Sequence, residues 1–208
     1  MAKLYLTRHG ETEWNVEGRM QGRQNSLLTK RGREQASWLS ERLNNININL
    51  IISSPSARAL ETAEIIRGTR DIEIVQDEHF LEINVGDWEG CLKGDIEKKD
   101  PDKSLLFWTK PHLFKTTNGE DFYQVRERVL PWLKHILNEY QGQEVLIVTH
   151  AIVLKIILSY FNKTPLERLW EGPYIEGTSL TTVEISGEDW KISQCADTSH
   201  FKIVPMKL

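Results

Sequence analysis

The sequence has few cysteines, no long apolar run and no basic cluster, and each of these absences excludes a class of protein. Its 208 residues include two cysteines, Cys91 and Cys195; they predict no disulfide framework and favour a cytoplasmic location. Lys155 interrupts the longest apolar stretch, so we expect no membrane span, which would need roughly 20 residues. Acidic residues outnumber basic ones by 30 to 26, so a nucleic-acid partner is not expected.

Common motifs for metal and nucleotide sites are also absent. The chain has no HExxH, CxxC or His-x-His spacing, and it lacks the GxSxG, GxGxxG and P-loop patterns. We therefore expect neither a metal nor a cofactor. No repeat and no Pro- or Ser-rich linker divides the chain, so we expect a single domain.

Hydrophobic spacing and helix-capping residues predict strands that alternate with helices. We expect strands at residues 4–7, 50–53, 72–75 and 145–149, helices at about 30–44, 55–66, 119–140 and 151–161, and a terminal hairpin formed by 179–185 and 190–195. Pro131 should kink or restart the helix over 119–140. This order of elements is typical of a mostly parallel sheet that is covered by helices on both faces.

Polar residues follow three of the predicted strands. Arg8 and His9 follow the first strand, Arg58 comes soon after the second, and His150 follows the apolar strand at 145–149. In parallel sheets, ligands bind beyond the carboxyl ends of the strands. We therefore expect these four side chains to meet at one edge of the sheet, although they are far apart in the sequence.

Arg58 is the least expected of the four. Ser54 and Pro55 predict the cap and the first residue of its helix, so Arg58 falls in the first turn, where the helix dipole disfavours a cation by up to about 1 kcal/mol. A surface contact with Glu61 or Thr62 is one explanation. The other is a bound anion: two arginines, two histidines and helix N-termini suit a tetrahedral phosphate.

Five ordered segments resemble the histidine phosphatase superfamily, the phosphoglycerate mutase-like proteins. They are residues 6–15 (LTRHGETEWN), 28–36, 53–63, 81–82 with 86–90, and 148–150. The similarity spans most of the chain and looks closest to the PhoE-type broad-specificity phosphatases. It implies a three-layer α/β/α sandwich with a mostly parallel sheet and a C-terminal antiparallel strand or hairpin. It also implies one domain over residues 1–208, with an excursion at about 86–120 over the active site.

The resemblance further implies a role for individual residues. His9 would be the nucleophile that forms a phosphohistidine, and Glu82 would donate a proton to the leaving oxygen. Glu82 must be protonated for that step, so we expect burial or a nearby carboxylate to raise its pKa. The residues implied to hold the substrate's phosphoryl group are Arg8, Arg58, His150, Asn15, Gln21 and Gly22. Fixed cations would then supply the charge that other phosphatases obtain from a metal ion.

Two departures from the family pattern bear on the reaction. Ala151 stands where many members have Gly, which should change the pocket only slightly. Val85 replaces a Tyr of the mutase branch, and residues 105–110 contain no arginine pair. Because mutases use those groups for phosphoglycerates, their absence favours hydrolysis of phosphate monoesters.

Several alternatives stay open at this point. They are a phosphoglycerate mutase, a dedicated α-ribazole or sugar-phosphate phosphatase, and a non-catalytic module that binds phosphoproteins. The last is disfavoured because both His9 and Glu82 are present. The expected partner is a small-molecule phosphate ester, and the protein should be a monomer or a homodimer.

Five large aromatic residues are candidates for the leaving-group side of the pocket. They are Trp88, Phe107, Trp108, Phe114 and Tyr174. Large aromatic side chains are ordinarily part of the core. If enough of these five line the pocket, aryl and apolar phosphate esters should be better substrates than small, highly charged ones.

Overall fold

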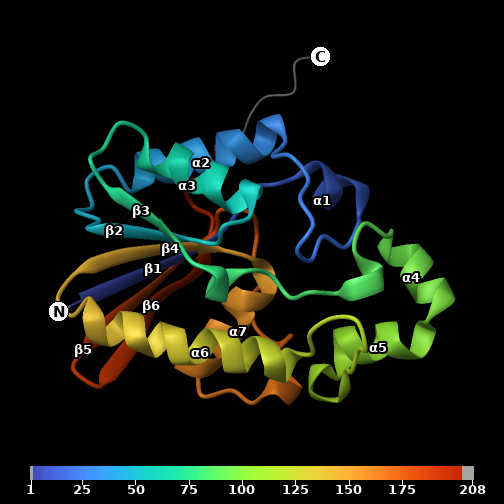
Figure 1. Cartoon of the computed structure of the whole chain (residues 1–208). Coiled ribbons are helices and arrows are strands. Elements are labelled where there is room, and N and C mark those ends of the chain that lie inside the picture. Colours follow the sequence, from blue (N-terminus) through green and yellow to red (C-terminus); the bar gives the residue numbers. More distant parts are fainter. Residues whose placement is uncertain (1, 203–208) are drawn as a thin grey trace.

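The computed structural model describes residues 2–202 and contains, within that range, one sheet of six strands (Figure 1). The strands are β1 (Ala2–Arg8), β2 (Leu50–Ser53), β3 (Glu73–Gln76), β4 (Glu144–Thr149), β5 (Leu180–Ser186) and β6 (Asp189–Asp197). Their order is β3-β2-β4-β1-β5-β6. The first four are parallel to one another, and β5 and β6 form an antiparallel hairpin at one edge.

Helices cover both faces of this sheet. The α-helices of the described range are α1 (Glu13–Glu17), α2 (Lys30–Arg42), α3 (Ala57–Arg67), α4 (Lys93–Lys99), α5 (Pro101–Thr109), α6 (Phe122–Glu139) and α7 (Ala151–Phe161). Figure 1 shows α2 and α3 on one side of the sheet, α6 and α7 on the other, and α4 and α5 beyond its end. The predicted α/β/α sandwich with a C-terminal antiparallel hairpin is thus confirmed. None of the helices in the described range could cross a membrane.

Strand β4 shows why the sheet needs cover on both faces. Val145 and Ile147 join the apolar core under α6 and α7, whereas Leu146 and Val148 join the core under α2 and α3. Successive side chains of a strand point to opposite faces. An unbroken apolar strand is therefore buried on both sides, as the sequence predicted.

The start of α3 differs from the prediction. The helix begins at Ala57 with Ser56 as its N-cap residue, two residues later than Ser54 and Pro55 predicted. Neither serine hydroxyl caps the helix, because both lie within hydrogen-bond distance of the His150 ring. Arg58 is still in the first turn.

The expected effect of Pro131 was also wrong in part. Helix α6 runs from Phe122 to Glu139 without a restart at Pro131. Proline leaves the carbonyl of Glu127, four residues earlier, without its helical partner. Both residues are exposed, so water can solvate that carbonyl. The opposite face of α6 is buried in the core, and this packing holds the helix together.

Candidate active site

The carboxyl ends of β1 and β4 bring the predicted residues together. Arg8 lies opposite Thr149 in the parallel register, and the His9 amide donates to the Thr149 carbonyl at 2.9 Å. His9 and His150, which follow these two residues, have ring centroids 5.2 Å apart. Residues separated by about 140 positions thus form one site.

The His9 ring is a neutral imidazole in which one nitrogen carries a proton and the other does not. Its Nδ1 lies 2.8 Å from the Gly10 carbonyl oxygen, which only accepts hydrogen bonds, so Nδ1 carries the proton. Burial lowers the pKa of His9 well below its usual value, and the charges of Arg58 and Arg8 lower it further. At neutral pH Nε2 is therefore unprotonated, and its lone pair accepts from Arg58 Nε at 3.2 Å.

Arg58 is fully buried and lies between the two histidines. Its Nε is 3.2 Å from His9 Nε2, and its Nη2 is 3.2 Å from His150 Nδ1. The remaining N–H groups donate to the carbonyls of Gly22 and Gln24 and to the Asn25 side chain. Burial lowers the pKa of Arg58 to about 10, so it is still a cation at neutral pH.

The alternative of a surface contact for Arg58 is wrong. Its guanidinium points inward, and Glu61 pairs with Arg33 instead. Thr62 touches only the main chain of Arg58, because its hydroxyl donates to the Arg58 carbonyl. The buried charge of Arg58 is thus directed at the site.

His150 is anchored by two serines that sequence reasoning missed. Its Nε2 lies 2.8 Å from Ser54 Oγ and 3.3 Å from Ser56 Oγ. Burial lowers the pKa of His150 well below its usual value, and the charge of Arg58 adds to the effect. The ring is consequently neutral at neutral pH. Both serines lie in a predicted motif, but nothing in the sequence shows that their hydroxyls face a ring about 95 residues away.

Arg8 and Gln21 each carry a buried polar atom without a partner among the described residues. Arg8 Nη1 donates to the Ile175 carbonyl at 2.9 Å, but its Nε has no acceptor. Gln21 Nε2 donates to Thr12 Oγ1 at 2.7 Å, and its Oε1 is unpaired. Both side chains line the same cavity as His9. A buried polar atom without a partner is costly, so the Arg8 donor is suited to an anionic ligand.

Asn15 and Gly22 also line this cavity. The Asn15 side chain accepts from the Thr12 amide in the capping box of α1. Gly22 has a φ of +52°, and a Cβ there would lie 2.3 Å from a Glu89 oxygen. Gly22 thus allows a close turn that directs its carbonyl to Arg58. All eight residues predicted for the site lie in one region.

Glu82 lines the same cavity. Its Oε1 accepts from the Ile83 amide at 3.0 Å, and its Oε2 accepts from the Ile152 amide of α7 at 3.2 Å. Burial raises the pKa of Glu82; the two amides and the charges of Arg58 and Arg8 act in the opposite direction but are outweighed. The carboxyl group is thus biased toward the protonated form, as a proton donor requires.

The cavity that seven of these residues line has a volume of about 290 Å³. His150 is fully buried and is not part of the lining; it contacts the site through Arg58. Of the five aromatic candidates, Trp108 and Tyr174 line it. The other three, Trp88, Phe107 and Phe114, are buried and pack against one another in the core, so a pocket role for them is wrong. Trp170, which sequence reasoning missed, also lines the cavity and lies 5.1 Å from Trp108.

Three further basic residues line the cavity, and the sequence did not single them out for it. They are Arg19, Lys93 and Lys155. Each already has a contact within the protein: Arg19 pairs with Glu17, Lys93 lies 5.6 Å from the Trp108 ring, and Lys155 donates to the Glu171 carbonyl. The lining of the cavity thus combines aromatic rings with several basic side chains.

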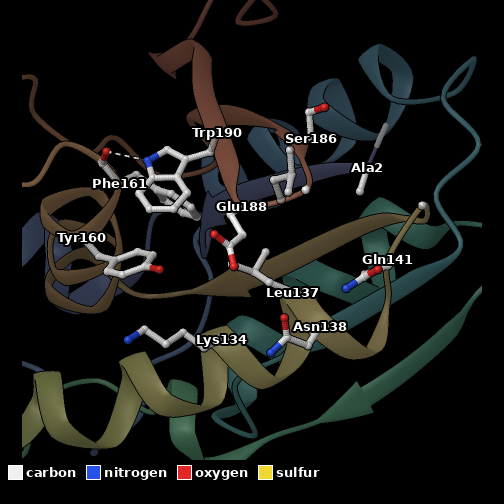
Figure 2. Close-up of a pocket in the computed structure, with 13 residues that line it drawn as sticks. Ala2, Lys134, Leu137, Asn138, Gln141, Tyr160, Phe161, Ser186, Glu188 and Trp190 are labelled. Carbon is white, nitrogen blue, oxygen red and sulfur yellow. Dashed lines mark hydrogen bonds between the residues drawn. The ribbon is translucent and has the colours of Figure 1, made fainter.

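A larger cavity, of about 590 Å³, lies at the opposite end of the sheet (Figure 2). It is bounded by α6, α7 and the β5–β6 hairpin, and the Tyr160 and Trp190 rings stack at one side. Its lining includes Lys134 and Glu188 but no histidine or arginine. Seven of the predicted site residues line the smaller cavity and not this one. Within residues 2–202, no three histidine, cysteine or carboxylate side chains are placed to hold a metal ion.

Comparison with known proteins agrees with this geometry. The family model of the histidine phosphatase superfamily, branch 1, matches residues 4–198. The chain belongs to this superfamily. A solved structure of Bacillus stearothermophilus YhfR superposes with a TM-score of 0.93 at 48% identity, covering 96% of this chain and 99% of that one.

Relatives within the superfamily carry the names of both phosphatases and mutases. "Phosphoserine phosphatase 1" of Hydrogenobacter thermophilus is 31% identical, covering 82% of this chain and 81% of its own. "Uncharacterized phosphatase PhoE" of Bacillus subtilis is 28% identical (96% and 97%). "Probable phosphoglycerate mutase GpmB" of Escherichia fergusonii is 31% identical (96% and 95%). The expected resemblance to histidine phosphatases, including the PhoE type, is thus confirmed.

Proposed function

We propose that this histidine phosphatase has broad specificity and hydrolyses phosphate monoesters through a phosphohistidine on His9, without a metal ion. The observation that carries the proposal is that His9 and Glu82 line one cavity. The pKa of the imidazole is lowered and that of the carboxyl group is raised. Burial thus favours an unprotonated nucleophile and a protonated acid in the same site.

In the first step, the lone pair of His9 Nε2 forms a bond to phosphorus in line with the leaving oxygen. The bond from phosphorus to that oxygen breaks, and Glu82 gives the oxygen its proton. Arg58 and Arg8 stabilise the charge on the phosphoryl oxygens. The N–H groups that Arg58 directs at the two histidines make its longest contacts, at 3.2 Å, and they are the ones best suited to turn to a phosphoryl oxygen.

In the second step, the Glu82 carboxylate takes a proton from water as the water oxygen attacks phosphorus. The bond between His9 and phosphorus breaks, its electrons return to Nε2, and inorganic phosphate leaves. Glu82 is then protonated again and His9 is neutral, so the site is ready for another cycle. One carboxyl group thus serves as acid and then as base.

The walls of the cavity favour aryl and apolar esters. Trp108, Trp170 and Tyr174 offer aromatic surface on the leaving-group side, and Val85 adds an aliphatic one. We expect phenyl phosphates to be hydrolysed with a higher kcat/KM than 3-phosphoglycerate.

A phosphoglycerate mutase is the second candidate, and the basic residues around the cavity favour it. Arg19, Lys93 and Lys155 would attract an anionic leaving group. Against it, the chain has neither the mutase tyrosine nor the arginine pair. Incubation with 3-phosphoglycerate and 2,3-bisphosphoglycerate separates the two: a mutase forms 2-phosphoglycerate, whereas a phosphatase releases phosphate.

The nucleophile is tested by trapping the phosphoenzyme. After rapid mixing with 32P-labelled phenyl phosphate in EDTA, acid-labile label should be found on His9, and His9→Ala should carry none. His135→Ala, at a half-exposed ring on α6 outside the site, serves as the control histidine and should keep the label on His9. Label at another residue, or loss of activity in EDTA, would overturn the proposal.

A further inference from the structure

The position of Glu82 depends on a segment that has no regular secondary structure. After the short 3₁₀ helix at Glu78–Phe80, residues 81–85 form neither helix nor strand. Among the described residues, the Glu82 carboxyl group accepts from two main-chain amides and from no side-chain donor. One of these amides, of Ile152, belongs to α7, so the placement of the carboxyl group depends on that helix and on whatever fixes the main chain on either side of Glu82.

Arg128 of α6 fixes the side that precedes Glu82. Its Nη1 donates to the His79 carbonyl at 2.6 Å and to the Leu81 carbonyl at 2.9 Å. The Arg128 side chain is 16% exposed. One guanidinium thus holds two carbonyls of the segment, the second of them in the residue next to Glu82.

Glu120 fixes the side that follows Glu82. Its Oε2 accepts from the Asn84 amide at 2.9 Å, and its own amide donates to the Asn84 carbonyl at 2.7 Å. Arg128 binds both oxygens of the same carboxylate, at 2.9 and 3.1 Å. The two charged side chains therefore form one clamp that holds residues 79–84 at both ends.

We propose that Arg128 and Glu120 are positioning residues for Glu82 and set its reach to the leaving oxygen. The inference rests on the proposed function. A planar guanidinium bound by a carboxylate has little freedom, and the carbonyls that it holds are fixed with it. A displacement of about 1 Å at a reacting group can reduce the rate about 100-fold. Loss of the clamp should therefore slow the transfer of a proton from Glu82 to the leaving oxygen.

A second connection offers a competing explanation. Glu120 also lies 3.2 Å from Arg23, which is next to Gly22, and the Gly22 carbonyl accepts from Arg58. Loss of the clamp could in principle disturb Arg58 instead. Arg58 acts on the phosphoryl oxygens of every ester, so that route would slow all substrates equally. In kcat/KM, which reports only the steps up to release of the leaving group, the position of Glu82 matters only where the leaving group needs a proton; its later role as a base toward water does not enter.

The leaving group therefore decides between the two explanations. 4-Nitrophenyl phosphate releases a weakly basic phenolate, whereas phenyl phosphate releases one that needs protonation. We expect Arg128→Met and Glu120→Gln to lower kcat/KM for phenyl phosphate at least 10-fold more than for 4-nitrophenyl phosphate, within the 10²–10⁴ that general acid catalysis supplies. Equal losses on the two esters would overturn the inference.

A double-mutant cycle with Glu82→Gln gives a second readout that does not depend on the stability of the fold. If Arg128 acts through Glu82, adding Arg128→Met to Glu82→Gln should change kcat/KM for phenyl phosphate by less than about 3-fold, because the coupled effect is already lost. A further loss as large as that of Arg128→Met alone would contradict the proposal. If wild-type protein hydrolyses neither ester, the proposed function itself fails.

Arg42→Met is the matched control. Arg42 pairs with Asp197 at 2.5 Å, and the two side chains are 21% and 24% exposed, so the control removes a similar half-buried ion pair. Neither residue touches the segment 79–84. We expect Arg42→Met to alter both esters by the same small factor. If Arg42→Met also lost more activity on phenyl phosphate than on 4-nitrophenyl phosphate, destabilisation alone would explain the difference between the two esters. That result would also overturn the inference.

Discussion

At the scale of single residues, one physical effect prepares both reacting groups. Removal from water disfavours the charged form of any titratable side chain. It lowers the pKa of His9, which must be neutral to attack, and raises that of Glu82, which must be neutral to donate. The same burial thus favours the neutral form of two groups of opposite acid-base character, and the neutral form is the one that each needs for its role.

This arrangement predicts the pH dependence of kcat/KM. The acid limb reports protonation of His9, whose pKa is well below 6.5, so activity should persist below pH 6.5. The alkaline limb reports deprotonation of Glu82, whose pKa is above 4.5. We expect Glu82→Gln to abolish the alkaline limb for phenyl phosphate. Glu188→Gln, at the far cavity, should keep the wild-type profile. An unchanged alkaline limb in Glu82→Gln would show that another group controls it.

The sequence predicted the residues that a motif marks and missed those that only a contact reveals. Arg58 and Glu82 stand in recognisable patterns near strand ends, so they could be placed. Ser54, Glu120 and Arg128 act through hydrogen bonds to segments 36 to 96 residues away. No local spacing encodes such a contact.

Aromatic residues show the same limit. Trp88 and Trp108 are equally large and belong to the same part of the chain, yet Trp88 is 9% exposed in the core, and Trp108 is 41% exposed and lines the cavity. Which of them packs inward depends on how α4 and α5 fold over the end of the sheet.

At the scale of elements, the apolar pattern predicted where strands and helices lie. It was less reliable for their ends and interruptions. The N-terminus of α3 shifted because Ser54 serves His150 rather than the helix, and α6 continues through Pro131 because its opposite face is buried. In both cases a tertiary contact outweighs a local preference.

A glycine in α2 makes this competition measurable. Helix propensity alone says that Gly32→Ala should add up to about 1 kcal/mol of stability. However, a Cβ at Gly32 would lie 2.1 Å from the Glu11 carbonyl oxygen, two residues after His9. We expect the opposite sign: a loss of about 1–3 kcal/mol, typical of overpacking, together with a lower kcat. Urea unfolding and phenyl phosphate assays would measure both.

Gly94→Ala is the matched control for this substitution. Gly94 is also helical, in α4, but a Cβ there would meet nothing within 4 Å. Its stability should stay level or rise by up to about 1 kcal/mol. If Gly32→Ala were as stable as Gly94→Ala, the close approach of α2 to the loop after β1 would not require a glycine at position 32.

At the scale of the whole molecule, folding places several histidines in surroundings that lower their pKa. His9 and His150 are buried beside Arg58, and burial with the nearby Arg42 lowers the pKa of His200 to about 4. In the unfolded chain, histidine takes up a proton near pH 6.5. The site and the C-terminal segment therefore share one source of acid sensitivity, although they lie in different parts of the protein.

The sign of this linkage predicts how stability changes with pH. A lowered histidine pKa contributes stability above pH 6.5 that is lost as the pH falls from 6.5 toward the folded-state value, at about 1.4 kcal/mol per pH unit for each group. The raised pKa of Glu82 acts in the opposite direction but is a single group. We therefore expect the free energy of unfolding to fall between pH 7 and pH 5.

The contribution of one histidine can be isolated without touching the active site. His200→Gln removes one titrating group, so its unfolding free energy should fall less steeply between pH 7 and pH 5 than that of the wild type, by about 1 kcal/mol per pH unit. Asn138→Gln, at an exposed position of α6 that carries no titratable group, should follow the wild-type slope. Urea titrations at half-unit pH steps would measure all three. Equal slopes for His200→Gln and the wild type would mean that the His200 ring takes up its proton as readily in the folded protein as in the unfolded chain.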